Sequence, residues 1–182
     1  MPYNWAMSSN SVKHLTPSKP ASIESIVRAW LGTAAGIGMI GWLAALQFSG
    51  SDYLLIVGSF GASSVLLFAA PGSPLAQPRN LFGGHFLSAL IGTAAYLLLI
   101  EMPIMASAVA VATAIAAMQI THTLHPPGGA TALIAVIGTD AVHQLSFGYV
   151  VPIMIGAGVL FVAALASQNL FSSTRRYPEY WW

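Results

Sequence analysis

Hydrophobic residues fill this chain in long uninterrupted runs, a pattern that predicts helices crossing a membrane. Five runs are long enough, or nearly so, to span a bilayer core of roughly 30 Å as helices of about 20 residues. They cover residues 28–48, 53–70, 82–100, 103–121 and 147–170. A sixth run, residues 130–138, is too short to cross as a helix. Extended backbone rises about 3.3 Å per residue, so residues 122–129 in that form, added to the sixth run, would still reach across.

The composition indicates an all-α membrane protein rather than a soluble domain. Hydrophobic residues make up 56% of the chain and charged residues 6%, about a quarter of the charged share of soluble proteins. So few charges could not cover the surface of a soluble domain. There is no basic cluster to suggest nucleic acid, and no cysteine to supply thiolate ligands. We expect the lipid bilayer as partner and no metal or cofactor. The sequence leaves the oligomeric state open, and a homo-oligomer is one of the alternatives.

The charged residues alternate between the connections of the apolar runs. Basic residues occupy the N-terminal segment, the second connection and the C-terminal segment, namely Lys13, Lys19, Arg28, Arg79, Arg175 and Arg176. Acidic residues occupy the other three connections, namely Asp52, Glu101 and Asp140. Six crossings place every Lys and Arg inside, as the positive-inside rule requires, whereas a re-entrant sixth run would put the last two arginines outside. We therefore predict six spans in a bacterial inner or plasma membrane, with both termini cytoplasmic.

Weak internal matches predict that the chain is a duplication. Residues 44–47 resemble 116–119, residues 61–63 resemble 129–131, Phe82-Gly83 resembles Phe147-Gly148, and Ile91-Gly92 resembles Ile155-Gly156. Three spans per copy would insert the second copy upside down, giving two inverted repeats with an axis in the membrane plane. We expect repeat one over about 28–101 and repeat two over 103–170, within a membrane domain of residues 26–171. Flexible tails, residues 1–25 and 172–182, would flank this domain.

The most informative segment is His125-Pro126-Pro127-Gly128-Gly129-Ala130-Thr131, which interrupts apolar sequence at membrane depth. Irregular backbone survives there only when it is buried in protein or lines a cavity. We predict broken helices at Gly61 and Gly129, whose amino-terminal ends face each other near the bilayer centre and hold a small anion. The expected site residues are Gly61, Ala62, Ser63, Ser64, His125, Pro126, Pro127, Gly128, Gly129, Ala130 and Thr131.

Four further residues are weighed as secondary members of this site. His122 lies three positions before His125, but Pro126 favours an extended His125, which argues against a shared helical face. His85 follows two glycines at a span start and would face the cytoplasmic mouth. Arg79 and Asn80 would attract anions to that mouth, although Arg79 is already explained by topology. No nearby carboxylate completes a metal site with the histidines.

The His-Pro-Pro-Gly-Gly-Ala-Thr-Ala-Leu stretch of residues 125–133 resembles the signature of the HPP family of integral membrane proteins. Residues 58–63 and the proline-rich residues 70–80 resemble the same family, and the similarity covers about residues 25 to 170. Some cyanobacterial and plastid relatives are nitrite transporters. The resemblance therefore implies nitrite transport in nitrogen assimilation, whereas the residues themselves indicate only a small inorganic anion.

Two alternatives stay open at this point. One is a passive channel for a small anion or neutral solute, because inverted half-helices serve channels as well as carriers. The other is a non-transporting membrane scaffold with a conventionally packed bundle. An enzyme is not expected, since no nucleophile–base or carboxylate pair occurs within a span.

Overall fold

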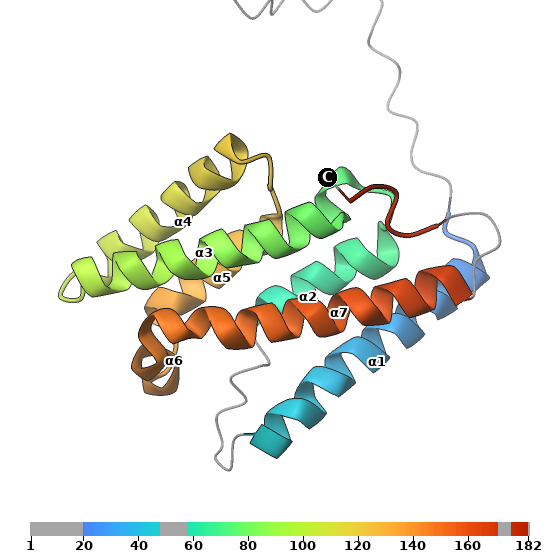
Figure 1. The fold of residues 1–182 in the computed structure, drawn as a ribbon, viewed down its shortest axis with the longest axis horizontal. Coiled ribbons are helices and arrows are strands. Elements are labelled where there is room, and N and C mark those ends of the chain that lie inside the picture. Colours follow the sequence, from blue (N-terminus) through green and yellow to red (C-terminus); the bar gives the residue numbers. More distant parts are fainter. Residues whose placement is uncertain (1–19, 48–57, 171–175, 182) are drawn as a thin grey trace, which may run out of the picture.

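A computed structural model describes residues 20–47, 58–170 and 176–181 of the 182-residue chain. Its elements are all helical, as predicted (Figure 1). In chain order they are α1 Ile23–Gln47, α2 Gly58–Ser64, the π-helix η1 Val65–Ala69, η2 Pro74–Ala76, α3 Pro78–Leu98, α4 Pro103–Ile120, α5 Pro126–Ile137, α6 Asp140–Leu145, η3 Ser146–Tyr149 and α7 Val150–Leu170. Four of the charged residues on which the predicted topology rests lie outside the described residues, namely Lys13, Lys19, Asp52 and Arg175.

Four of the described helices are long and apolar enough to cross a membrane: Ile23–Leu46, Pro78–Leu98, Pro103–Ile120 and the continuous segment Asp140–Leu170. The other two predicted spans correspond to shorter apolar helices, Gly58–Ala69 and Pro126–Ile137. Twelve residues of helix, as in α5, rise only about 18 Å. The chain is thus a multi-pass integral membrane protein that combines four long helices with two short ones.

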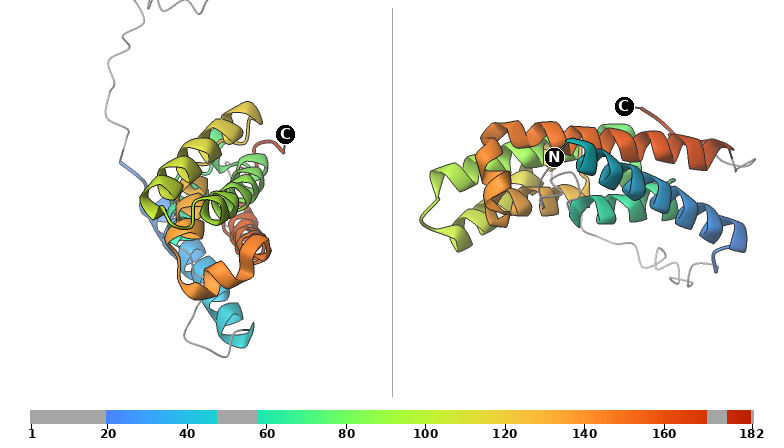
Figure 2. Two further views of the ribbon diagram at one scale, coloured as in Figure 1. Left: turned by 90° about the vertical axis from the view of Figure 1, so that its left-hand side faces the viewer. Right: turned by 90° about the horizontal axis from the view of Figure 1, so that it is seen from below.

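The helices α3 and α7 pack against each other and form the centre of the bundle. α1 lies along α7, and α4 lies along α3, so the two outer helices flank this central pair toward opposite ends (Figures 1 and 2). The short helices α2 and α5 pack against each other and run in opposite directions (Figure 1). Side chains from α3, α7 and η3 fill much of the core, including Leu81, Leu160 and Tyr149.

Prolines determine where several helices begin. Pro78, Pro103 and Pro126 each stand at the start of a helix, where the missing N–H costs nothing and the fixed φ suits the helix.

The predicted breaks at Gly61 and Gly129 are wrong, because α2 and α5 continue through both glycines. The extended stretch predicted for residues 122–129 is also too long, since α5 already begins at Pro126. His125 itself is extended (φ −136°, ψ 103°), as the following proline requires.

The connections gather at two ends of the bundle. At one end, Arg79 in the first turn of α3 donates to the Thr121 carbonyl, and the Tyr177 hydroxyl donates to the Ala76 carbonyl. This end therefore holds the 70–78 connection, the turn after α4 and the C-terminal segment. At the other end, Tyr96 near the end of α3 stacks on His143 of α6, with ring centroids 3.8 Å apart.

We expect the basic end to face the cytoplasm, and this can be tested with single cysteines in the cysteine-free chain. Glu101→Cys and Asp140→Cys, both at exposed positions, should react in intact cells with a membrane-impermeant maleimide. The exposed Pro74→Cys should react only after the membrane is opened, because positively charged connections are retained inside. Labelling of Pro74→Cys from outside would reverse the orientation.

Candidate functional site: a buried histidine network

The close approach of α3 and α5 depends on small residues. A Cβ on Gly84 would lie 2.5 Å from the His125 Cβ, and one on Gly92 would lie 2.5 Å from the Ala132 carbonyl oxygen. From α5, a Cβ on Gly128 would lie 2.7 Å from the Ser88 hydroxyl. Glycine at these positions lets the two backbones touch, as in other membrane helix pairs. The contact brings the polar start of α5 against the middle of α3.

Four fully buried side chains meet beside this contact: Ser63 of α2, His85 of α3, His125 at the start of α5, and Thr131 of α5. The Ser63 hydroxyl lies 2.8 Å from His85 Nε2 and 2.9 Å from His125 Nε2. The Thr131 hydroxyl lies 2.8 Å from His85 Nδ1, and His125 Nδ1 lies 2.8 Å from the Leu75 carbonyl oxygen. We call these four side chains the histidine network.

The Leu75 carbonyl determines the direction of every hydrogen bond in the histidine network. A carbonyl only accepts, so His125 must donate from Nδ1, and in the neutral ring its Nε2 must then accept from Ser63. The Ser63 hydroxyl has a single proton, so His85 must donate to it from Nε2. The neutral His85 ring then accepts at Nδ1 from Thr131. The bonds therefore run in one direction, from Thr131 to Leu75.

Aromatic rings enclose the histidine network. The ring of Phe60 meets His85 edge-on at a centroid distance of 5.4 Å, and the two histidine rings lie 4.9 Å apart. The Tyr149 hydroxyl donates to the Thr131 carbonyl at 3.5 Å. One turn before Ser63, the Ser59 hydroxyl is buried and has no hydrogen-bond partner among the described residues. Ser59 and Ser63 are four residues apart and so share a face of α2.

A cavity of about 420 Å³ opens at the basic end of the bundle, next to the histidine network. Its lining is Pro74, Arg79, Asn80, Met118, Gln119, His122, Leu124 and Tyr180. Arg79 Nη2 donates to the Thr121 carbonyl at 2.9 Å, and Asn80 Nδ2 donates to the Leu124 carbonyl at 2.7 Å. These bonds fix the turn that leads into His125. Three of the four secondary residues predicted from the sequence thus line one cavity.

His122 has a different local role from His125. It adopts a left-handed conformation (φ 56°) just after α4, and the Thr123 N–H donates to the Met118 carbonyl at 2.9 Å. This is the Schellman arrangement that ends many helices, usually with glycine at the left-handed position. His122 is exposed on the cavity, whereas His125 is buried.

The structure distributes the other predicted residues unevenly. Gly61 and Ala62 are exposed on the outer face of α2, and Ser64 donates to the Phe60 carbonyl of its own helix. Pro126 is exposed, Pro127 and Gly128 are buried, and Gly129 and Ala130 are half-buried. The glycine at which another backbone approaches is therefore Gly128 rather than Gly129, where a Cβ would lie 3.9 Å from its nearest neighbour, Val111.

Sequence reasoning placed His85 at the cytoplasmic mouth, but it lies at the centre of the histidine network. The preceding Gly83-Gly84 pair was the available signal, because both glycines are in close contact with the 123–125 segment. Ser59, Leu75 and Tyr149 were not predicted, and nothing in the local sequence distinguishes them. No group of three or more His, Asp or Glu side chains in the described ranges is placed to hold a metal ion.

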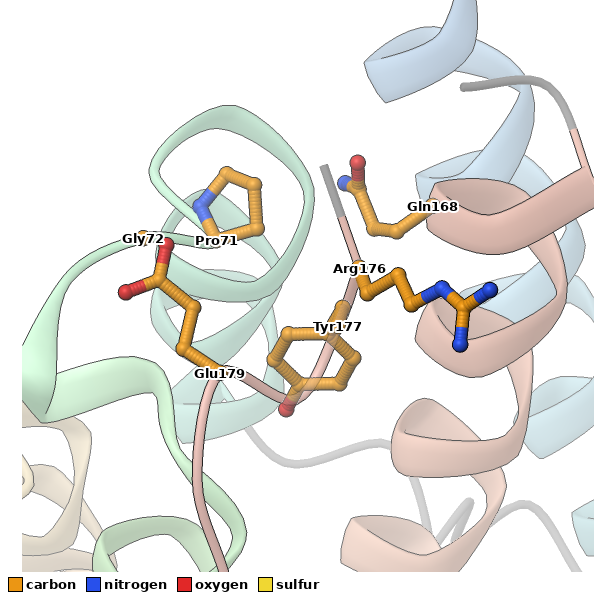
Figure 3. Close-up of a pocket in the computed structure, with 6 residues that line it drawn as sticks. All are labelled: Pro71, Gly72, Gln168, Arg176, Tyr177 and Glu179. Carbon is orange, nitrogen blue, oxygen red and sulfur yellow. The ribbon is translucent and has the colours of Figure 1, made fainter. Parts of the chain in front are cut away.

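The C-terminal segment closes the basic end. The Tyr177 hydroxyl donates to the Ala76 carbonyl at 2.8 Å, and the Glu179 N–H donates to the Gln77 side chain at 2.9 Å. Burial raises the pKa of the Tyr177 phenol, which keeps it a donor. A small cavity of about 10 Å³ lies beside Tyr177, with Arg176 and Glu179 pointing away from each other (Figure 3). This space holds one water at most, so it offers no room for a ligand. The segment therefore has a structural role, which is to hold the basic end together through its hydrogen bonds.

Comparison with known proteins identifies relatives but no substrate. The family model described as "HPP, transmembrane region" matches residues 18–178. A transmembrane protein of Dictyostelium discoideum is 41% identical over 163 residues, which cover 88% of this chain and 57% of that protein. A second Dictyostelium transmembrane protein is 39% identical over 165 residues, covering 89% and 53%. The chain thus spans little more than half the length of these relatives. No solved structure matches significantly.

Adjacent glycines in α5 offer a matched test of the α3–α5 contact. Gly128→Ala should destabilise the protein by about 1–3 kcal/mol, because the added methyl enters occupied space. Gly129→Ala should be neutral or slightly stabilising, since its methyl meets only ordinary contacts and alanine favours helix. Thermal unfolding of the two purified variants in detergent measures the difference. Equal midpoints would show that the backbones do not touch at Gly128.

Proposed function

The chain belongs to the HPP transmembrane family, and on that premise we propose that it transports a small inorganic anion, with nitrite as the first candidate. Nitrite comes from the family resemblance alone. The names of the Dictyostelium relatives say only that they are transmembrane proteins. The class of substrate, in contrast, rests on the histidine network and its surroundings.

The observation that carries this proposal is a polar centre inside an apolar bundle. Buried polar side chains at membrane depth are costly and usually mark a pathway for a substrate or ion. Here the polar centre lies where two short helices, α2 and α5, pack against each other. The unpaired Ser59 hydroxyl supplies a buried donor one turn from Ser63. We infer that the anion binds between α2 and α5 at this hydroxyl and at the start of α5.

The charges around this position favour an anion over a cation. Among the described residues, the acidic side chains are Glu24, Glu101, Asp140 and Glu179, and all belong to helix ends or connections. None is hydrogen-bonded to the histidine network. Arg79 and His122 line the adjoining cavity, which would concentrate anions at the entrance. The start of a helix adds further positive potential.

Helix packing supports the inverted-repeat arrangement within this proposal. Exchanging α1, α2 and α3 with α4, α5 and α7 maps the α3–α4 contact onto α7–α1, and the α3–α5 contact onto α7–α2. The matched glycines Gly92 and Gly156 have equivalent roles, because a Cβ on Gly92 would meet α5 and one on Gly156 would meet Phe60 of α2. The matched hydroxyls of Ser63 and Thr131 bond the two nitrogens of His85.

In this arrangement the short helices complete six crossings, and both termini are cytoplasmic. Among the described connections, those between α2 and α3 and between α4 and α5 lie toward one end of the bundle, and those between α3 and α4 and between α5 and α7 toward the other (Figure 1). Arg79 and Arg176 belong to the first end, and Glu101 and Asp140 to the second. The cavity at Arg79 is then the cytoplasmic entrance. The proposal assigns no enzymatic reaction to the chain.

Uptake by purified protein in lipid vesicles tests the function directly. Vesicles should accumulate nitrite with saturation, and nitrate, formate and chloride should compete to different degrees. Counter-transport of nitrite would identify a carrier, and its absence a channel. Protein-containing vesicles that take up none of the four anions faster than empty vesicles would contradict the proposal.

Two hydroxyl variants locate the anion within the bundle. Ser59→Ala should weaken apparent affinity by roughly tenfold or more, because a hydrogen bond to a charged ligand contributes about 1.5–3 kcal/mol. Thr131→Val should weaken it as well, because it leaves His85 Nδ1 without a donor and so disturbs the histidine network beside the anion. Ser107→Ala is the control, since that exposed hydroxyl bonds only its own helix. Wild-type affinity in both site variants would place the anion elsewhere.

A further inference from the structure

We propose that the anion crosses the membrane together with a proton, and that the histidine network takes up this proton. The inference rests on the proposed anion transport, and it adds a second substrate. The histidine network is suited to this because it can hold either of two proton counts while the four hydrogen bonds that link Thr131, His85, Ser63, His125 and the Leu75 carbonyl are all retained. Each arrangement follows from the donors and acceptors of the four side chains and the Leu75 carbonyl.

The neutral arrangement is the one that the Leu75 carbonyl imposes. Thr131 donates to His85, His85 donates to Ser63, Ser63 donates to His125, and His125 donates to Leu75. Each ring carries one N–H and each hydroxyl one O–H. The histidine network then has no net charge.

The second arrangement contains one more proton. When a hydronium ion gives a proton to Thr131 Oγ1 and leaves as water, the old Thr131 proton moves to His85 Nδ1, and the His85 Nε2 proton moves to Ser63. The Ser63 proton moves to His125 Nε2. Thr131, His85 and Ser63 have then each gained one proton and lost one, whereas His125 has only gained one. His125 becomes an imidazolium, which donates from Nδ1 to Leu75 and from Nε2 to Ser63. The three hydrogen bonds between His125 and Thr131 now run in the opposite direction: His125 donates to Ser63, Ser63 to His85, and His85 to Thr131.

Thr131 has a second acceptor that suits only this protonated arrangement. Its hydroxyl lies 3.4 Å from the Pro127 carbonyl oxygen, one helical turn back. In the neutral arrangement the Thr131 hydroxyl donates its proton to His85 Nδ1. After the reversal the hydroxyl accepts from His85 and can donate to the Pro127 carbonyl. Both proton counts therefore leave no donor unpaired in the histidine network, and this is the condition for a buried polar group to change charge cheaply.

The protonated arrangement needs a counter-charge that the surrounding protein does not supply. The groups facing the two rings are Ser63 and Phe60 from α2, Leu75 from η2, and Met118 from α4, whose sulfur lies near Gly84. From η3, the Tyr149 hydroxyl reaches the Thr131 carbonyl.

No carboxylate within the described part of the chain bonds the histidine network. The nearest basic side chain along α3 is Arg79, which precedes His85 by six residues, a rise of about 9 Å.

An anion bound beside α5 would supply this missing charge. The imidazolium stabilises the anion and the anion stabilises the imidazolium, and this coupling is necessarily reciprocal. Moving the pair together also avoids carrying a net charge through the hydrocarbon region, where an unpaired charge is expensive. Proton and anion are therefore expected to cross in equal numbers.

Vesicles that contain both purified protein and an internal pH dye test this coupling. With the membrane potential clamped by potassium and valinomycin, an inward nitrite gradient should acidify the interior by about one proton per nitrite. The measurement is made above pH 7.5, and protein-free vesicles correct for diffusion of nitrous acid. Nitrite uptake without acidification would overturn the coupling but leave anion transport standing. Absence of nitrite uptake would overturn both.

Two serine variants separate the proton path from general packing. In the wild type, lowering the external pH should raise the initial nitrite uptake rate by up to about tenfold per pH unit, as binding of one proton requires. Ser63→Ala removes the hydroxyl that bridges the two histidines and should abolish this dependence. Ser88→Ala should retain it, because the Ser88 hydroxyl is buried on α3 but bonds the Met118 sulfur, at 3.9 Å, rather than a histidine. The same pH dependence in both variants would overturn the proposal.

A spectroscopic measurement of the histidines does not depend on transport. Nitrogen NMR of histidine-labelled full-length protein in lipid should show His125 as the Nδ1–H tautomer and His85 as the Nε2–H tautomer at alkaline pH. On acidification in the presence of nitrite, His125 should become doubly protonated and His85 should change tautomer. His125→Gln and His85→Gln assign the two signals. Rings that stay neutral and unchanged down to pH 5 with nitrite would show a purely structural network.

Discussion

The lack of water in the hydrocarbon core of a membrane is the constraint on which the rest of this structure depends. A polar side chain at that depth must find its partner within the protein. Ser63, His85, His125 and Thr131 meet this requirement mainly through one another, and the Leu75 carbonyl ends the series. This arrangement needs helices closer than ordinary side chains permit. The glycines on α3 and α5 allow that approach, so the packing and the polar chemistry depend on the same residues.

The two short helices follow from the same constraint. A helix of twelve residues does not cover the hydrocarbon core, so its ends must lie against protein. The start of α5 lies against α3 and α2, and His125 is buried there. At the end of η1, the Gln168 amide of α7 donates to the Leu67 and Phe68 carbonyls at 3.1 Å each. The long helices thus supply the hydrogen-bond partners that the bilayer would deny to the short ones.

The sequence predicted the helical class, most span positions and the importance of the 125–131 segment, because hydropathy and charge placement report directly on membrane burial. It predicted the helix starts less well. Pro126 and Pro127 were interpreted as extended backbone, although proline at the first helical position initiates α5. His85 was assigned to the mouth because local sequence cannot reveal which residues a distant helix brings alongside. Likewise, Gly61 and Gly129 were predicted as the helix breaks, but it is the neighbouring Gly128 that another backbone approaches, which only the position of α3 determines.

The histidines also bear on how the proposed inverted repeats would give the proposed transport a direction. On the alignment of Phe82 with Phe147, the counterpart of His85 in the second half is Val150, so this ring has no twin. Ser63 and Thr131 do correspond, and both bond His85. A strictly symmetric protein would present equivalent surroundings to both sides of the membrane. In the proposed repeat, His85 lies between two matched hydroxyls and is joined through Ser63 to His125, which bonds the Leu75 carbonyl. This one-way series of bonds would give the bundle a polarity that two repeated halves alone would lack.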